Sequence, residues 1–215
     1  MCSKKLMIIN FFFIFFVVLF LDKNTKAATY CGQYTEKIAK EYKIPNKLLT
    51  SISLVESGLK KGKNFVSWPW TLNVSGKSKF FNSKDETISF LKKNYDKKKN
   101  IDVGCMQISL KYHGQNFENF NQILDPKNNI EYAAKYLKSL HSKHKTWNEA
   151  ISRYHSSIPQ RKKIYLKKVK TYWADLRQKK INMDFAIDFE EITKRQRKIK
   201  YFRNEFRKQK LLDSI

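Results

Sequence analysis

The stretch "ISLVESGLK" (Ile52–Lys60) ends a predicted helix with a carboxylate beside its apolar face. Apolar residues recur at helical spacing through the preceding turns, and Glu56 lies next to Leu49 and Ile52 on that helix. Glu56 also occupies the last turn, where the helix dipole disfavours negative charge. Both effects raise the pKa of a carboxyl group and suit it to general acid catalysis. The alternative is that Glu56 is an ordinary residue at the edge of the apolar face and that its carboxylate reaches solvent.

Helical periodicity dominates the rest of the chain. Pro45 is expected in the first turn of the helix that carries Glu56, and Gly58 is expected as the C′ glycine that ends it. Other helices are predicted by N-terminal signals, which are the capping boxes Ser83 with Glu86 and Thr146 with Glu149, and Asp125 before Pro126. A further helix near the C-terminus has an apolar stripe of Tyr165, Val169, Tyr172 and Leu176.

One segment breaks the helical pattern. Residues 68–81 contain two short β runs joined at Ser75-Gly76, which is typical of a tight hairpin. We therefore predict an all-α domain with a minor β component, made of about seven short helices and one small β-hairpin at about 68–81.

The composition is strongly basic, with 44 Lys and Arg against 19 Asp and Glu and a formal net charge of +25. Such a surface attracts polyanions, whether nucleic acid, anionic membrane or anionic wall polymer. The alternative is compositional bias, because the chain favours Lys, Asn, Ile and Phe as an AT-rich coding sequence does. The Lys-rich face at 161–180 has the same two interpretations.

The N-terminus is typical of a secretion signal. Two lysines precede the apolar run Leu6–Leu21, and Thr25 and Ala27 occupy positions −3 and −1 of a cleavage site. The run is short for a transmembrane helix. We expect residues 1–27 to be a signal peptide cleaved near Ala27, with a periplasmic or secreted product. An uncleaved membrane anchor is the alternative.

The mature chain would keep two cysteines, Cys31 and Cys105. In an oxidising compartment two cysteines indicate one disulfide, which would close a long loop and contribute about 4 kcal/mol. Two free buried thiols are the alternative.

Three short motifs occur in a fixed order: "ES" at Glu56-Ser57, "GCMQI" at Gly104–Ile108 and "RYH" at Arg153–His155. Together they resemble the soluble lytic transglycosylase catalytic domain of bacterial wall enzymes. The resemblance covers about Cys31 to Leu176. "ES" alone has little specificity and "GCMQI" is moderately specific, but the ordered set behind a secretion signal is a strong match.

The resemblance implies a goose-lysozyme-like α-fold and cleavage of the β-1,4 bond between N-acetylmuramic acid and N-acetylglucosamine in peptidoglycan. Most glycosidases use two carboxylates, whereas members of this family use one Glu. That Glu protonates the glycosidic oxygen and then takes a proton from the C6 hydroxyl, which closes a 1,6-anhydro ring. Glu56 fits this role, and Asp102, the nearest other candidate, is expected in a turn.

The remaining site residues follow from matched positions. Ser57 would hydrogen-bond near the acetamido group or Glu56, and Gly104 would let the backbone approach substrate. Met106 and Gln107 would line the sugar subsites. Plain core packing is the alternative for Met106.

The "RYH" motif supplies two more candidates. Tyr154 would place its hydroxyl beside Glu56 and fix its rotamer, with core packing as the alternative. His155 stands where the usual motif has Asn, so it keeps a donor and an acceptor and adds a titratable group. The hairpin resembles an insertion in one secreted subgroup of this family. In that subgroup a cysteine also precedes Met-Gln, and this resemblance supports pairing Cys31 with Cys105.

Other aromatic and histidine clusters are less specific. His141 and His144 have i,i+3 spacing but no third ligand nearby, so we expect a solvated face and no metal. Trp68, Trp70 and Phe80 would either stack on sugar rings or bury the hairpin against the helices.

We therefore expect a monomeric enzyme that binds peptidoglycan strands, with no cofactor and no nucleic acid partner, and touches a membrane only through an uncleaved signal. Its catalytic domain would span 28–180, followed at 181–215 by a basic helical or loosely ordered extension. Its small size, by analogy, suits local wall opening for a secretion or division complex. The alternatives are a hydrolytic muramidase and a non-catalytic wall- or polyanion-binding protein. A nucleic-acid-binding role is disfavoured by the secretion signal.

Overall fold

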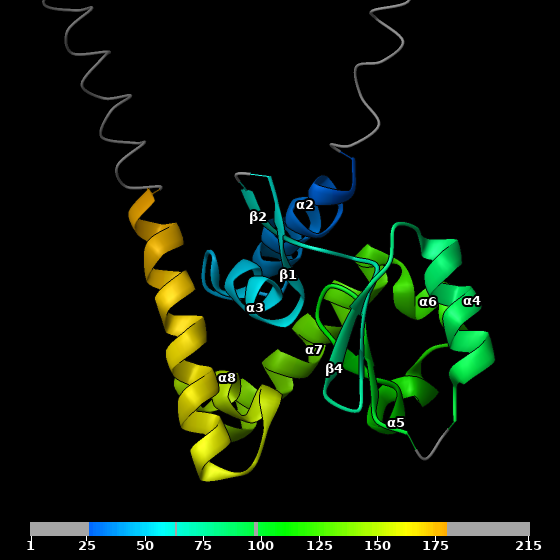
Figure 1. The fold of residues 1–215 in the computed structure, drawn as a ribbon. Coiled ribbons are helices and arrows are strands. Elements are labelled where there is room, and N and C mark those ends of the chain that lie inside the picture. Colours follow the sequence, from blue (N-terminus) through cyan, green and yellow to red (C-terminus); the bar gives the residue numbers. More distant parts are fainter. Residues whose placement is uncertain (1–25, 63, 97–98, 180–215) are drawn as a thin grey trace, which may run out of the picture. The chain divides into compact units, whose positions relative to one another are not determined.

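The computed structural model describes residues 26–62, 64–96 and 99–179 (Figure 1). The chain divides after Trp173 into two units, and every contact described below lies in the first. The predicted signal peptide lies outside the described residues except for its last two positions, which begin the first described helix, and the predicted extension at 181–215 lies wholly outside them. In the described part of the chain, no helix is long and apolar enough to cross a membrane.

The described elements are mostly helical, as predicted. The helices are α2 (Lys26–Glu41), α3 (Leu48–Ser57), α4 (Lys84–Asn94), α5 (Leu110–His113), α6 (Phe120–Leu124), α7 (Pro126–His144) and α8 (Trp147–His155), with a 3-10 turn η1 (Gly114–Asn116). Residues 159–179 are also helical and are called helix 159–179 below. The strands are β1 (Gly58–Lys61), β2 (Asn64–Ser67), β3 (Thr71–Val74), β4 (Lys77–Phe80), β5 (Ile101–Val103) and β6 (Ile108–Ser109).

The predicted hairpin is present, but it belongs to a larger sheet. β3 and β4 pair through a turn in which Ser75 and Gly76 both have positive φ, at 50° and 89°. β5 pairs with β3 and β6 pairs with β5, which makes an antiparallel sheet in the order β4-β3-β5-β6. β1 and β2 form a separate hairpin. The additional strands have two to four residues, too few for a period of two to be visible in the sequence.

Most predicted helix starts are confirmed. Ser83, Asp125 and Thr146 cap α4, α7 and α8, each accepting a hydrogen bond from a backbone N–H three residues later. The start of α3 differs, because the helix begins at Leu48 rather than at Pro45. Lys47 precedes it with φ of 66°, and that left-handed residue separates Pro45 from the helix.

Gly58 follows the last helical residue of α3, but not as a left-handed cap. Its φ is −60°, so its conformation does not require glycine. A Cβ atom at this position would lie 2.2 Å from the Phe65 ring and 2.3 Å from the carbonyl oxygen of Leu54. The absence of a side chain therefore lets β2 pack closely over the end of α3.

The core forms where α7 meets its neighbours. α7 packs against α2, α6 and α8 (Figure 1), and α2 also packs against α3. The fully buried large side chains are Ile38, Leu48, Leu49, Ile52, Leu72, Leu91, Ile101, Met106, Ile123, Leu124, Ile130 and Leu137. This arrangement fixes the ends of α3 and α8 relative to the sheet.

The predicted disulfide is present between Cys31 of α2 and Cys105 of the β5–β6 loop, with Cα atoms 5.9 Å apart. Both cysteines are completely buried. The bond closes a loop of 74 residues, for which chain entropy gives a stabilisation of about 4 kcal/mol. It therefore anchors the "GCMQI" segment to the helical core.

Candidate active site

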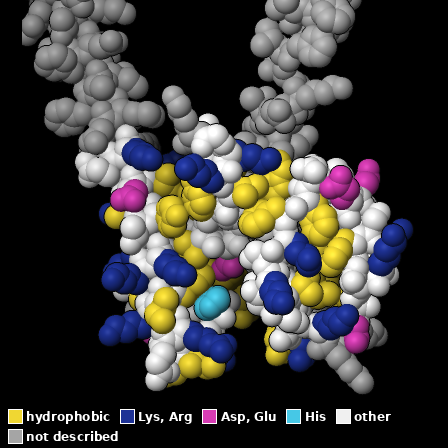
Figure 2. All heavy atoms as spheres, viewed as in Figure 1, with side chains coloured by type: hydrophobic (Ala, Val, Ile, Leu, Met, Phe, Trp, Pro, Cys, Tyr) yellow, Lys and Arg dark blue, Asp and Glu magenta, His cyan; other side chains and the backbone are white. Residues whose placement is uncertain are grey.

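A cleft of about 1000 Å³ lies between the four-stranded sheet and the helices around it. Its sheet side is formed by Asn73, Ser75, Gly76, Ser78, Asn100, Asp102, Gln107, Ile108 and Ser109. Its other lining residues are Val55, Glu56, Tyr112, His113, Tyr136, Arg153, Tyr154, His155, Ser156, Ser157, Arg161, Ile164, Tyr165 and Lys168. Figure 2 shows a hollow with an acidic and a histidine side chain inside it and Lys and Arg side chains around it.

Glu56 lines this cleft from the last turn of α3 and is half-buried. Burial raises the pKa of its carboxyl group to about 7, and the negative charge of Asp102 adds to the rise. A hydrogen bond from Tyr165 and the positive charge of Lys168 act in the opposite direction. At neutral pH the carboxyl group is therefore partly protonated, as its position in the sequence predicted.

The hydrogen-bond partner of Glu56 is Tyr165, which the sequence placed only on an apolar stripe. The Tyr165 hydroxyl donates to Oε1 of Glu56 at 2.5 Å, and the tyrosine side chain is otherwise buried. Its ring stacks on that of His155, with centroids 4.5 Å apart and planes 3° apart. The ring and the hydroxyl are thus both held, which fixes the direction of the hydrogen bond to Glu56.

Tyr154 lines the cleft but makes a different bond from the one predicted. Its hydroxyl donates to the carbonyl oxygen of Met106 at 2.8 Å rather than to Glu56. The negative charge of Glu56 is still close enough to raise the Tyr154 pKa, although burial is the larger cause. Tyr154 therefore ties α8 to the "GCMQI" segment.

Ser57 points away from the cleft. It is 1% exposed, and its hydroxyl donates to the carbonyl oxygen of Cys105 at 2.8 Å. Ser53, one turn earlier, makes a similar bond of 3.2 Å to the same oxygen. The structure therefore directs the Ser57 hydroxyl to the disulfide loop and not to Glu56 or the cleft, where it was predicted.

Gly104 and Met106 also face the interior rather than the cleft. Gly104 has φ of 81°, and a Cβ there would lie 2.6 Å from Nδ2 of Asn129. Met106 is completely buried and does not line the cleft, as its alternative role in core packing would require. The close approach that Gly104 permits is to Asn129 and not to a ligand.

Asn129 is a buried residue of α7 that the sequence analysis did not single out. Its Oδ1 accepts from the backbone N–H of Met106 at 2.8 Å. Its Nδ2 donates to the carbonyl oxygens of Val103 and Ile123, both at 3.0 Å. The sequence signal that could have identified Asn129 is its position as a polar residue beside Ile130 in the apolar stripe of α7. These three hydrogen bonds fix the backbone conformation of the segment that precedes Gln107.

Gln107 is the member of "GCMQI" that reaches the cleft together with Ile108. It has φ of 46°, an uncommon conformation for a residue with a side chain. Its Nε2 donates to the carbonyl oxygens of Gly104 and Thr71, at 3.0 and 3.2 Å. These bonds hold the Gln107 amide against the sheet at the edge of the cleft.

Asp102 is a strand residue rather than the expected turn residue. It belongs to β5, pairs with Ser109 of β6 and lines the cleft. Burial raises its pKa, while a hydrogen bond with Ser109 lowers it. Since Asp102 also raises the pKa of Glu56, the cleft contains a second carboxyl group close enough to act on the first.

Two histidines, which lie on different helices, line the cleft. His155 ends α8, and burial lowers its pKa with contributions from Arg161 and Lys168. His113 ends α5 and lies 2.9 Å from the Tyr132 hydroxyl, and burial lowers its pKa as well. The lowered pKa values favour the neutral form of both imidazoles near pH 7, and both side chains line the cleft.

The aromatic residues of the hairpin do not line the cleft. Trp68 is 6% exposed and donates from Nε1 to the carbonyl oxygen of Phe81 at 2.7 Å, so its alternative role in burying the hairpin is confirmed. The histidine pair of α7 was expected to bind no metal. The ring of His141 stacks on that of Trp147, with centroids 4.0 Å apart. In the described ranges, no three His, Cys, Asp or Glu side chains are grouped to hold a metal ion.

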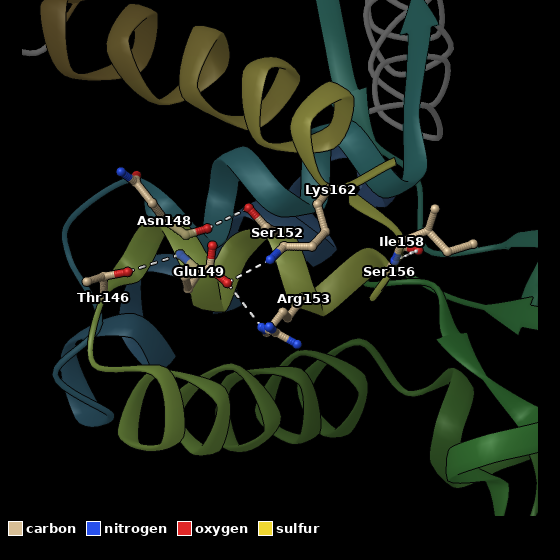
Figure 3. A network of polar contacts seen from close by, with 8 residues as sticks. All are labelled: Thr146, Asn148, Glu149, Ser152, Arg153, Ser156, Ile158 and Lys162. Atoms are coloured by element: carbon tan, nitrogen blue, oxygen red, sulfur yellow. Dashed lines mark hydrogen bonds and ion pairs between the residues drawn. The ribbon is translucent and has the colours of Figure 1, made fainter. Parts of the chain in front are cut away.

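Ion pairs join α8 to helix 159–179 and thereby shape one wall of the cleft. Oε2 of Glu149 accepts from Nε of Arg153 at 3.1 Å and from Nζ of Lys162 at 2.7 Å (Figure 3). Lys162 is thus tied to the first turn of α8 across the short connection between the helices. The contact positions the cleft residues that helix 159–179 carries.

A family model of the transglycosylase SLT domain matches residues 33–176, more than half of the chain. The chain belongs to this family. Neither a curated protein nor a solved structure matches the sequence. The mostly helical, lysozyme-like fold is that of an SLT domain, and membership implies peptidoglycan as substrate and a location outside the cytoplasm.

Proposed function

We propose that this protein is a secreted lytic transglycosylase that cleaves the bond between N-acetylmuramic acid and N-acetylglucosamine and forms 1,6-anhydro-N-acetylmuramic acid. Glu56 would act as the single general acid and base. The observation that carries the proposal is the position of Glu56 in the cleft, where burial raises its pKa to about 7. A group with this pKa donates and accepts a proton with similar ease at neutral pH.

The first step is departure of the N-acetylglucosamine. Because Oε1 of Glu56 accepts the bond from Tyr165, the proton is carried by Oε2. That proton passes to the glycosidic oxygen as its bond to C1 of the muramic acid breaks. The acetamido oxygen of the muramic acid attacks C1 and stabilises the positive charge that develops there.

The second step closes the anhydro ring. The Glu56 carboxylate takes the proton of the C6 hydroxyl, and the O6 oxygen displaces the acetamido oxygen from C1. Glu56 is then protonated again, so the cycle consumes no water. Gln107, Tyr154 and His155 would hold the sugars, since all three line the cleft within the same region.

Residues 1–27 would direct export and be removed near Ala27, and residues 28–180 would form the catalytic domain in the periplasm. Recruitment by a secretion or division complex is the biological setting that this small enzyme would suit.

Digestion of purified sacculi tests the proposal. The wild-type protein is expected to release anhydro-muropeptides, which are lighter by one water than the products of hydrolysis. Glu56→Gln is expected to lose activity by at least about a hundredfold, because a general acid contributes on that order. Glu118→Gln, at an exposed position outside the cleft, serves as the matched control. Unchanged clearing of sacculi by Glu56→Gln would exclude catalysis by Glu56.

A hydrolytic muramidase is the second candidate, and Asp102 favours it. Hydrolysis normally needs a second carboxylate to activate water or stabilise the sugar, and Asp102 lies in the same cleft with its charge felt by Glu56. The two candidates differ in the mass of the product and in the effect of Asp102→Asn. Products containing the added water, lost in Asp102→Asn, would establish the muramidase.

A further inference from the structure

Helix 159–179 presents one stripe of side chains to the cleft. Arg161, Ile164, Tyr165 and Lys168 all line it, with the i, i+3, i+4, i+7 spacing that places residues on one helix face. Tyr165 is buried against Glu56, whereas the other three are exposed, and Ile164 is 60% exposed. The rim of the cleft therefore has an aliphatic side chain between two cations.

Arg161 and Lys168 line the cleft without being held in an ion pair by any of the described residues. In the described residues, Arg153 and Lys162 both pair with Glu149 (Figure 3), but no carboxylate lies within ion-pair distance of Arg161 or Lys168. Their charges are directed at the cleft, since both lower the pKa of His155. An anion bound beside them would be attracted by both charges.

The opposite side of the cleft is polar but uncharged apart from Asp102. Asn73, Ser75, Ser78 and Asn100 supply amide and hydroxyl groups there, which suit the hydroxyl groups of neutral sugars. The sugar rings themselves give no reason for paired cations. An anionic substituent of the glycan does, and in peptidoglycan each muramic acid carries a short peptide with free carboxylates and small aliphatic side chains.

We propose that Arg161 and Lys168 bind carboxylates of the stem peptide on the muramic acid, with Ile164 contacting its aliphatic side chains, so that the protein prefers peptide-bearing strands. This inference rests on the proposed function. Lys168 also acts on the charge of Glu56, so the anion that it binds must be attached near the scissile bond. A separate anionic polymer would instead contact the exposed lysines of the whole helix, Lys163 and Lys167 included.

Binding measurements on the mature chain with Glu56→Gln test this inference, because that variant would not consume the ligand. Three ligands are compared: peptidoglycan fragments with stem peptides, the same fragments stripped of peptides by an amidase, and fragments whose peptide carboxylates are converted to amides. The peptide-bearing fragments are expected to bind about tenfold more tightly than the other two. Adding Arg161→Gln or Lys168→Gln is expected to remove most of this difference and to leave the affinity for stripped fragments within about twofold.

Lys167→Gln and Lys163→Gln are the matched controls, since both lysines are exposed on the same helix but do not line the cleft. Equal affinity for peptide-bearing and stripped fragments would overturn the inference and leave the proposed function intact. Equal losses in the control and cleft variants would also overturn it and would favour general attraction of polyanions. Failure to bind any glycan fragment would contradict the proposed function itself.

Discussion

The Tyr165 hydroxyl donates a hydrogen bond of 2.5 Å to Oε1 of Glu56, across 109 positions of sequence. The same tyrosine ring stacks on His155, so the bond joins the end of α3 to α8 and helix 159–179. This contact lowers the pKa of Glu56 against the stronger effect of burial. It therefore contributes both to the direction of the carboxyl group and to its proton affinity.

Removing this hydroxyl is expected to change the pH dependence of activity. In Tyr165→Phe the pKa of Glu56 rises, because a bond that favours the carboxylate is lost. The alkaline limb of the rate profile, where the acid loses its proton, should shift to higher pH, and the maximal rate should fall about tenfold as the rotamer is released. Rates on soluble glycan fragments across a pH series measure both effects.

Tyr154→Phe is the control for that experiment, because the Tyr154 hydroxyl bonds to Met106 rather than to Glu56. This variant is expected to leave the pH of the alkaline limb of the rate profile unchanged. A shift in Tyr154→Phe with none in Tyr165→Phe would mean that Tyr154 is the residue that acts on Glu56 in solution.

Glu56 should make the folded state less stable as pH rises. Its pKa is about 7 in the folded protein against an ordinary value of 4.5, so between these values the folded state binds more protons than the unfolded state. The free energy of unfolding therefore decreases with pH in that window. Glu56→Gln removes this dependence and is expected to be about 1–3 kcal/mol more stable than wild type at pH 8.

Chemical denaturation at pH 4 and pH 8 measures this prediction, with Glu118→Gln as the exposed control. Below pH 4.5 the carboxyl group is protonated in both states, so the advantage of Glu56→Gln should largely disappear there. An equal advantage at both pH values would show that relief of local packing, and not titration, is the cause.

Loss of the disulfide is expected to destabilise the cleft as well as the core. Replacing Cys31 and Cys105 together by Ala should lower the free energy of unfolding by about 4 kcal/mol, because the bond closes 74 residues. The carbonyl oxygen of Cys105 also accepts from Ser57, so activity should decrease under conditions in which the variant remains folded. Reductant should reproduce the loss in wild type and have no effect on the double variant.

Asn129→Ala is expected to be strongly destabilising. It leaves the backbone N–H of Met106 and the carbonyl oxygens of Val103 and Ile123 without their present partner, in a fully buried site. A loss of about 2–4 kcal/mol is expected from urea unfolding. Asn128→Ala is the matched control, because Asn128 contributes its backbone N–H to the cap of α7 and not its side chain. Similar losses in both variants would contradict the assigned role of Asn129.

Local signals predicted much of the fold correctly. The caps at Ser83, Asp125 and Thr146, the hairpin at Ser75-Gly76 and the helical class all depend on residues within a few positions of one another. The environment of Glu56 was also predictable, since burial and position in a helix follow from periodicity. The extra strands were missed because pairs such as β3 with β5 form between distant segments.

The sequence by itself indicated a carboxyl group with a raised pKa in the last turn of α3 and a disulfide between the two remaining cysteines, both of which the structure has. Only the tertiary structure decided which tyrosine bonds to Glu56, since Tyr154 and Tyr165 occupy equivalent stripes of two neighbouring helices. The tertiary structure also decided that the side chains of Ser57 and Met106 are buried in the protein interior. The physical reason is that periodicity specifies which face of a helix is buried, whereas hydrogen-bond partners depend on how those faces pack in space.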